Sequence, residues 1–270
     1  MADGKWSSDE MMTIAAARLL RGGAVCFVGI GLPSAAANLA RATHAPDVVL
    51  IYESGTIGAK PDVLPLSIGD GELAETADTV VSTPDIFRYW LQGGRVDVGF
   101  LGTAQIDRFG NINTTVIGDY DAPKVRLPGA GGAPEIAACA GEVFIIIRQS
   151  PRSFVDKLDF ITSAGHGEGG AWRTDAGLPG KGPTVIITDI GILKPDPRSR
   201  EFMMTNLHPG YTIADAEAAV GWPLKQAAEC AETLPPSTLE LAALRDINER
   251  TARAHAPAPD SANINAPSHG

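Results

Sequence analysis

Glu53 is the residue of this sequence whose position points most directly to chemistry. It follows the apolar run 48–52 and precedes the turn-forming run Ser-Gly-Thr-Ile-Gly at 54–58. An apolar run of this length, ended by glycine, predicts a buried strand of a parallel sheet. Open α/β sheets bind ligands beyond the carboxyl ends of such strands. Glu53 is therefore a candidate nucleophile or base, although a charged loop residue that happens to follow a strand would give the same pattern.

Several glycines could supply the hydrogen-bond donors that such a carboxylate needs when it is withdrawn from water. Gly55 could offer its backbone N–H group within the turn after Glu53. Gly129, Gly131 and Gly132 precede an expected helix, and glycine-rich turns that open a helix bind anions through backbone donors. The same glycines would also suit a tight strand–helix connection, so both interpretations stay open.

Polar side chains surround a turn after the expected strand 96–101. They are Gln105, Asp107, Asn111 and Asn113. Their amides could orient a substrate, or they could cap the turn by bonding to their own backbone. Arg126 is a candidate clamp for a carboxylate of the substrate, because its guanidinium can bind two oxygens at once.

Two competing active-site motifs are incomplete. Ser54 is not the nucleophile of a Gly-x-Ser-x-Gly turn, because Tyr52 stands where the first glycine belongs. Gly29 and Gly31 begin a dinucleotide-binding pattern that lacks its third glycine. His166 lies between two glycines and is expected to be a solvated loop residue rather than a general base.

The composition is that of an ordinary globular protein with 270 residues, 44% hydrophobic and 20% charged residues. A formal net charge of −10 disfavours binding to nucleic acid or to an anionic membrane. The sequence has no run approaching the roughly 20 apolar residues of a membrane span. Its first residues lack the basic and apolar regions of a signal peptide, so we expect a cytoplasmic protein.

The cysteines and histidines suggest neither disulfides nor a metal site. Cys26, Cys139 and Cys230 form no Cys-x-x-Cys pair, and their odd number argues against a disulfide framework. Cys26 and Cys139 are expected to be buried packing residues. The five histidines show no ligand spacing with cysteines or carboxylates. We therefore expect no bound metal.

Helices and strands alternate along the chain. Helices are expected at 8–21, 34–42, 83–91, 133–140, 212–220 and 237–254, and strands at 25–28, 48–52, 96–101, 143–147, 185–188 and 202–206. This order predicts an α/β fold with an open, mainly parallel sheet and helices on both faces. The glycine-rich stretch 163–182 is expected to be a long mobile loop. We expect a single domain over 1–255 and a disordered tail over 256–270.

Five segments together resemble the β subunit of family I coenzyme A transferases. They are 29–34, 53–55, 105–113, 117–120 and 129–133, and they follow the order of that family within residues 9–222. Segments 9–13, 25–28 and 69–75 are most similar to the members that act on 3-oxoadipate, and the members that act on glutaconate are next.

The resemblance implies how such a protein would work. Glu53 would be the nucleophile and would carry coenzyme A (CoA) as a glutamyl thioester. Gly55 and the 129–132 turn would belong to the CoA and acyl pocket. CoA would be a carried substrate rather than a resident cofactor, and acyl-CoA and dicarboxylic acids from aromatic-compound degradation would be the ligands. A separate α subunit would pair with this chain, either as single αβ pairs or as dimers of such pairs.

Three alternatives remain within the resemblance. The first is a glutaconate-type transferase with the same chemistry. The second is a CoA-thioester hydrolase subunit of the same fold, against which the retained Glu53 argues, because the related hydrolases have lost the glutamate. The third is a non-catalytic binding subunit.

Overall fold

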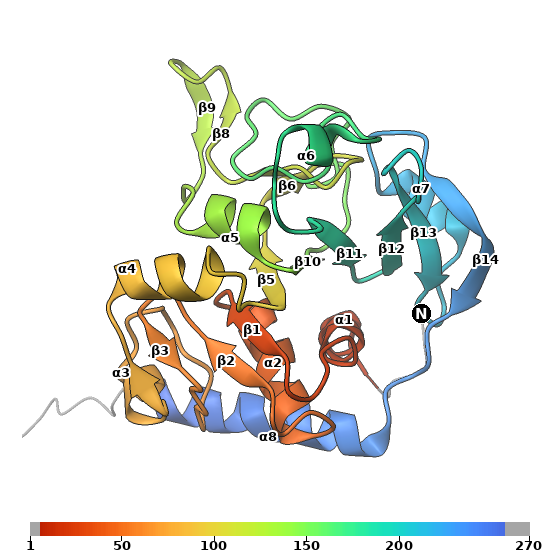
Figure 1. The fold of residues 1–270 in the computed structure, drawn as a ribbon. Coiled ribbons are helices and arrows are strands. Elements are labelled where there is room, and N and C mark those ends of the chain that lie inside the picture. The colour runs from red at the N-terminus through yellow and green to blue at the C-terminus, as the bar shows by residue number, and fades with distance from the viewer. Residues whose placement is uncertain (1–5, 257–270) are drawn as a thin grey trace, which may run out of the picture.

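The computed structural model describes residues 6–256, through which a ten-stranded sheet runs (Figure 1). The strands lie in the order β14-β13-β12-β11-β10-β5-β1-β2-β3-β4. Their bounds are β1 (Val25–Val28), β2 (Val49–Ile51), β3 (Thr56–Ile57), β4 (Thr79–Val80), β5 (Val98–Gly102), β10 (Glu142–Ile146), β11 (Pro183–Ile187), β12 (Gly191–Pro195), β13 (Phe202–Leu207) and β14 (Lys225–Glu232). The neighbouring strands β2, β1, β5, β10 and β11 run parallel, and β14 is parallel to β13. The remaining pairs are antiparallel, so the predicted open and mainly parallel sheet is confirmed.

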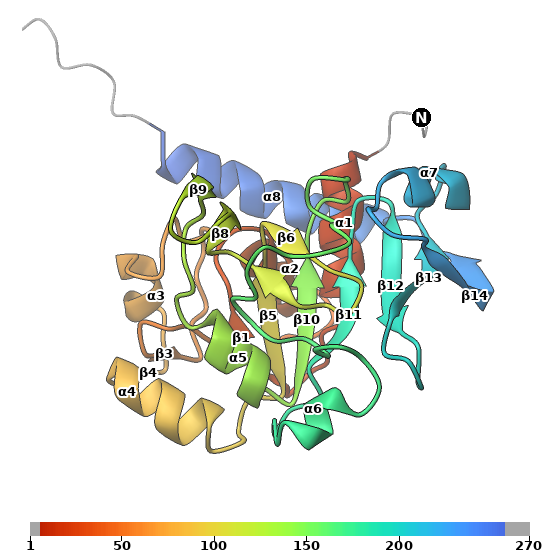
Figure 2. The same cartoon turned by 90° about the horizontal axis from the view of Figure 1, so that it is seen from above.

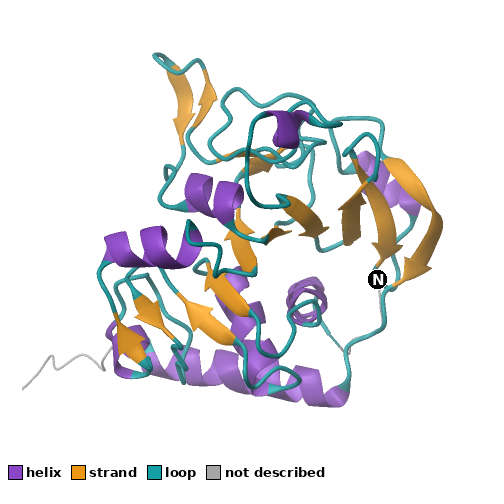
Figure 3. Cartoon of the chain, in the orientation of Figure 1, coloured by secondary structure: helices purple, strands orange, loops and turns teal. Residues whose placement is uncertain are grey.

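Helices cover both faces of this sheet (Figures 2 and 3). One layer contains α1 (Ser8–Ala17), α2 (Leu32–Ala42), α3 (Gly71–Glu75) and α8 (Thr238–Ala254). The other contains α4 (Thr83–Asp85), the π-helix η1 (Ile86–Leu91), α5 (Ala133–Cys139), α6 (Trp172–Asp175) and α7 (Ile213–Ala218). Two small ladders lie outside the main sheet, β6 (Gln105–Ile106) with β7 (Ile112–Asn113) and β8 (Val116–Gly118) with β9 (Pro123–Arg126).

Successive strand residues face the two helical layers in turn. In β1, Cys26 and Val28 pack in the cluster that contains α1, α2 and α8, whereas Phe27 packs in the cluster that contains η1 and α5. Burying one large apolar side chain contributes about 1.5–3 kcal/mol. Because both faces are covered, the central parallel strands β1, β2 and β5 consist of apolar residues and glycine and do not alternate with polar residues.

Helix α5 lies very close to strand β5. A methyl group added at Gly99 would overlap the Ile136 side chain, so the absence of a side chain lets the helix approach the strand. This contact fixes the height of α5 above the sheet, which matters because the turn before α5 reaches Glu53.

Most expected elements are present, but some boundaries and short strands differ. Helix α1 begins with the predicted capping box of Ser7 and Glu10 and ends at Ala17, four residues before the predicted end. The sequence analysis missed the short helices α3 and α6, the short strands β3, β4 and β6 to β9, and the longer strands β12 and β14. The β14 residues are helix formers such as Ala, Glu, Gln and Lys, and their pairing with β13 overrides that propensity. The expected tail 256–270 lies, except for Ala256, outside the described residues.

The expected mobile loop at 163–182 is instead tied down by a buried cation, Arg173. Its side chain is 7% exposed and donates hydrogen bonds to five main-chain carbonyl groups. The shortest run to Gly180 and Ala137, at 2.6 and 2.7 Å. Two of the five acceptors, Ala137 and Ala138, lie in the last turn of α5. Burial lowers the pKa of Arg173 from its ordinary value.

The cysteines behave as expected in one case and not in another. Cys26 is fully buried, and burial raises the pKa of its thiol, which suits a packing residue. Cys139 is only partly buried, which corrects the expectation for it. Within residues 6–256, no helix is both long and apolar enough to cross a membrane. In the same range, no three histidine, cysteine or acidic side chains gather as metal ligands would.

Replacing Arg173 by methionine is expected to lower the free energy of unfolding by about 3 kcal/mol, because several buried carbonyl groups would lose their donor. Arg173→Lys should lower the free energy of unfolding by part of that amount, since one ammonium group cannot reach carbonyls on two segments. Urea unfolding followed by circular dichroism measures both. Arg198→Met, at an exposed site, should change stability by less than about 0.5 kcal/mol. Equal unfolding midpoints for all three variants would contradict the role of Arg173.

Candidate active site

A cleft of about 520 Å³ lies at the carboxyl ends of β1, β2 and β5. The chain leaves β1 towards β2 on one side and returns to β5 on the other, so the strand order reverses at β1. Open α/β sheets bind ligands at this kind of switch point. Residues 28–30, 53, 68, 101–104, 114, 128–131, 133 and 136 line the cleft. Glu53 is the one charged side chain among them.

A tight turn presents Glu53 to the cleft. The N–H of Gly55 donates to the carbonyl oxygen of Tyr52 at 2.9 Å, which closes the turn around Glu53. Tyr52 is fully buried and anchors the start of the turn. Gly55 has φ +95°, and a side chain there would overlap the carbonyl of Val81. Only glycine fits this position, and the turn therefore depends on it.

The Glu53 carboxylate is held from the far side of the cleft. The N–H of Gly132 donates to Oε1 of Glu53 at 2.7 Å. No described residue donates to the other oxygen, Oε2. Gly131 lines the cleft, and a methyl group placed on it would lie 3.7 and 3.8 Å from the two carboxylate oxygens. The Glu53 side chain is half-buried. One carboxylate oxygen is thus fixed while the other remains available for reaction.

The predicted donor glycines have different roles. Gly132 is the donor to Glu53, and no hydrogen bond among the described residues uses the N–H of Gly131. The N–H of Gly129 is committed to Thr114, at 2.8 Å. The N–H of Gly55 is committed to its own turn, so it is not the donor to the Glu53 carboxylate that the sequence analysis suggested.

Phe87 packs against Gly132, and the sequence analysis missed it. A methyl group on Gly132 would overlap both Oε1 of Glu53 and the ring of Phe87. The ring also packs against Phe27, with centroids 5.6 Å apart. Phe87 lies in the π-helix η1, where the N–H of Gln92 bonds five residues back to its carbonyl. A Ser-Thr-Pro helix start at 82–84 gives no sign of this widened turn, which occurs often at functional sites.

Gln105 and Asn111 lie within the protein and are fully engaged. Gln105 donates to the carbonyl of Arg152 at 3.2 Å and accepts from Asn113 at 3.1 Å. Asn111 donates to Asp107 and to the carbonyl of Gly167, both at 2.8 Å. Neither residue lines the cleft. Both amides tie the turn to distant segments, whereas Asp107 caps the turn itself, because its Oδ1 accepts from the N–H groups of Phe109 and Asn111.

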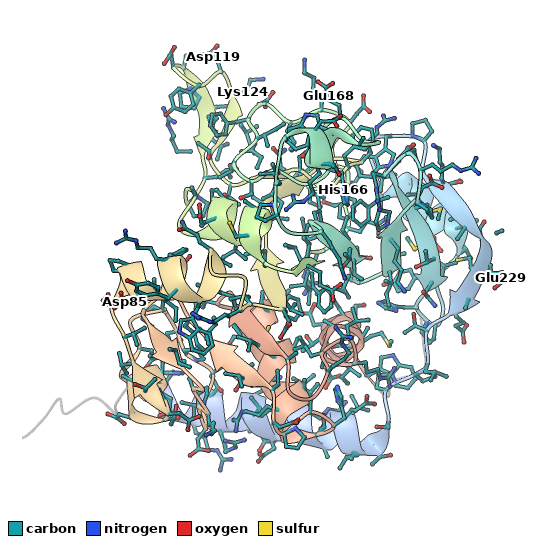
Figure 4. The ribbon with its side chains drawn as sticks, viewed as in Figure 1. Asp85, Asp119, Lys124, His166, Glu168 and Glu229 are labelled. Carbon is teal, nitrogen blue, oxygen red and sulfur yellow. The ribbon has the colours of Figure 1, made fainter. Side chains whose placement is uncertain are left out.

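Arg126 lies away from the cleft. It belongs to β9, in the hairpin that projects from the body and carries Asp119 and Lys124 (Figures 1 and 4). Its guanidinium donates to the carbonyl of Tyr120 at 2.8 Å and stacks over that ring, 5.0 Å from the centroid. Within this chain it therefore does not act as the expected clamp for a substrate bound at Glu53.

His166 is buried, which corrects the expectation of a solvated loop residue. It is 4% exposed, and Nε2 lies 2.8 Å from the carbonyl oxygen of Pro183 (Figure 4). A carbonyl can only accept, so Nε2 carries the proton. Burial lowers the pKa of the ring from its ordinary value, so His166 is neutral at neutral pH. It does not line the cleft at Glu53.

Known proteins resemble this chain over most of its length. A family model described as coenzyme A transferase matches residues 9–216. The chain is 69% identical over 250 residues to the β (B) subunit of 3-oxoadipate CoA-transferase from Pseudomonas knackmussii, covering 93% of this chain and 96% of that protein. It is 34% identical over 225 residues to the corresponding subunit of glutaconate CoA-transferase from Acidaminococcus fermentans, covering 81% and 84%. The crystal structure of glutaconate coenzyme A-transferase from that organism superposes with a TM-score of 0.85 and 32% identity, covering 94% of this chain and 99% of that one.

A double-mutant cycle tests the contact between Glu53 and Gly132. Gly132→Ala is expected to cost about 1–3 kcal/mol of stability, because its methyl group overlaps the carboxylate and Phe87. In a Glu53→Ala background that cost should fall by at least about 0.5 kcal/mol, since one of the two clashes is gone. Urea unfolding of the four proteins measures the coupling.

The matched control pairs Glu53→Ala with Gly71→Ala. A methyl group on Gly71 makes one ordinary contact, with Glu75 at 3.9 Å. The two substitutions should therefore be additive within about 0.5 kcal/mol. An equally small coupling for Gly132→Ala would show that Glu53 does not rest against Gly132.

Proposed function

The chain belongs to the coenzyme A transferase family, and we propose that it is the β subunit of a succinyl-CoA:3-oxoadipate CoA-transferase whose nucleophile is Glu53. One observation carries the assignment of the nucleophile: in the cleft at the switch point, Oε1 of Glu53 is held by Gly132 while Oε2 is free. A carboxylate in this state can attack an acyl carbon without first losing a hydrogen bond.

The first half-reaction transfers CoA to the protein. Oε2 of Glu53 attacks the thioester carbonyl of succinyl-CoA, the C–S bond breaks, and a mixed anhydride and CoA thiolate result. The thiolate then attacks the side-chain carbonyl carbon of Glu53, forming a glutamyl-CoA thioester and releasing succinate. In the second half-reaction, 3-oxoadipate attacks this thioester and the same steps run in reverse, which yields 3-oxoadipyl-CoA and regenerates the carboxylate.

Gly132 suits the second of these attacks. Once Oε2 has been acylated, Oε1 becomes the carbonyl oxygen of the anhydride and still accepts from Gly132. Negative charge develops on that oxygen when the thiolate adds to the carbon, and a donor already in place stabilises it. The uncommitted N–H of Gly131 is our candidate donor for the oxyanion that forms on the substrate carbonyl.

A glutamate fits this reaction better than a serine. The glutamyl intermediates are an anhydride and a thioester, whose free energies match those of the substrates. An oxygen ester on Ser54 would lie far below the thioester and would trap the enzyme. The apolar walls of the cleft, including Ile30, Leu101 and Ile136, also limit access of water, which would hydrolyse either intermediate.

The partner in this proposal is a separate α subunit. Each of the two relatives named above is designated as one subunit of its enzyme, which implies a second subunit in those enzymes. We infer that such a subunit covers the open side of the cleft and completes the substrate site. CoA is a transferred substrate in this scheme and not a resident cofactor.

Substitution and trapping test the role of Glu53 in the αβ complex. Glu53→Ala and Glu53→Gln should abolish transfer, and Glu53→Asp should reduce it at least about 100-fold, because the nucleophile is withdrawn by about 1.5 Å. Glu75→Gln, an exposed carboxylate change in α3, should keep full activity. Borohydride added with succinyl-CoA should inactivate the wild type and leave an alcohol at residue 53, seen by peptide mass spectrometry. Full activity of Glu53→Ala would contradict the proposed mechanism.

A competition assay tests the acceptor. With succinyl-CoA as donor, the complex should have a kcat/KM for 3-oxoadipate at least about tenfold above that for glutaconate, a difference of about 1.4 kcal/mol in transition-state binding. The reverse preference would identify a glutaconate-type transferase. Release of free CoA without an acceptor acid, faster than transfer, would identify a hydrolase.

A further inference from the structure

A second hollow adjoins the active-site cleft at the carboxyl ends of the strands. It measures about 400 Å³ and shares Ile30 and the 102–104 segment with the cleft at Glu53. It extends to the carboxyl end of β10, where Arg148 lies at its rim with Ser150 and Ser153. Together the two hollows cross the ends of β2, β1, β5 and β10, which are neighbours in this order.

Arg148 is the one cationic side chain among the described residues that line either hollow. Its backbone is fixed on both sides. The Ser153 hydroxyl donates to the carbonyl of Arg148 at 2.7 Å, and the next N–H, of Gln149, donates to Asp189 at 2.7 Å. The guanidinium remains 58% exposed and forms an ion pair with Asp9 of α1. An exposed pair of this kind contributes at most about 1 kcal/mol, so an anionic ligand can displace Asp9.

We propose that Arg148 binds the phosphate end of the CoA donor, with the pantetheine arm lying along the two adjoining hollows between Arg148 and Glu53. This inference rests on the proposed function. The chain carries a net charge of −10, so an anionic nucleotide requires a local cation, and Arg148 supplies it at the end of the cleft. Ile30, Leu32 and Ile147 offer an apolar wall for the arm.

The dimensions favour the phosphates of CoA over the distal carboxylate of the acid. Three strand spacings separate the ends of β2 and β10, which amounts to roughly 14 Å. The extended pantetheine arm spans roughly 16 Å from sulfur to phosphorus at about 1.2 Å per bond. The two carboxyl carbons of a six-carbon dicarboxylic acid are only roughly 6 Å apart on the same basis. An acid attached at Glu53 therefore ends well before Arg148.

Truncating the ligand and the residue together tests this proposal in the αβ complex. Arg148→Gln should lower kcat/KM for succinyl-CoA about tenfold, because one charge-assisted contact to phosphate is lost. It should change kcat/KM for succinyl-pantetheine, which lacks the phosphates, by less than about twofold. Asp9→Asn should raise kcat/KM for succinyl-CoA, since the competing carboxylate is gone. Arg152→Gln is an equal charge change at an exposed position outside both hollows. It should leave kcat/KM unchanged for both donors.

Each contrary outcome overturns the proposal in a recognisable way. Equal losses for both donors would place the succinyl carboxylate, and not a phosphate, at Arg148. Unchanged values for both would leave Arg148 as an ordinary surface ion pair. If the wild-type complex transfers no CoA from succinyl-CoA, the proposed function fails instead. Calorimetric titration with CoA and with pantetheine then makes the same comparison, and Arg148→Gln must weaken only CoA binding.

Discussion

The site depends on one hydrogen bond, from the backbone of Gly132 to the side chain of Glu53, between residues 79 positions apart. It joins the turn after β2 to the turn before α5. Glycines fix the positions of both turns. Gly55 allows the first turn to close, and Gly99 lets α5, which follows the second turn, approach the sheet. A backbone donor has no side-chain freedom to lose, so the Glu53 side chain is the only one that must be ordered for this bond. The same bond fixes which oxygen is held and which is free.

The electrostatics of the cleft follow from its walls. Apolar side chains and glycine backbone surround the carboxylate, with no other charged side chain lining the space. In such surroundings backbone dipoles act more strongly than they would in water. The chain as a whole is acidic and would repel the anionic substrates proposed for it, so their charge must be recognised locally. Arg148 is the place in this chain where we propose that such recognition occurs.

The sequence predicted the parts of this structure whose signals are local. The buried parallel strands, the capped helices and the position of Glu53 all follow from short runs of residues. The roles of Gln105 and Asn111 did not, because the direction of an amide in a turn is decided by distant carbonyl groups. The role of Arg173 could not be predicted either. Its hydrogen-bond acceptors are backbone carbonyl groups, which leave no pattern in the sequence. The edge strand β14 was missed because pairing outweighed the helical propensity of its residues.

Helix α5 is held in place by hydrogen bonds at both ends. Its first turn follows the glycine that holds Glu53, and its last-turn carbonyls accept hydrogen bonds from Arg173. The helix has only seven residues, so we expect it to move as a rigid unit. A displacement of the Arg173 segment would thus be transmitted along the axis to the nucleophile, far away in sequence. Natural variation in this remote glycine-rich stretch could tune turnover without touching a single substrate atom.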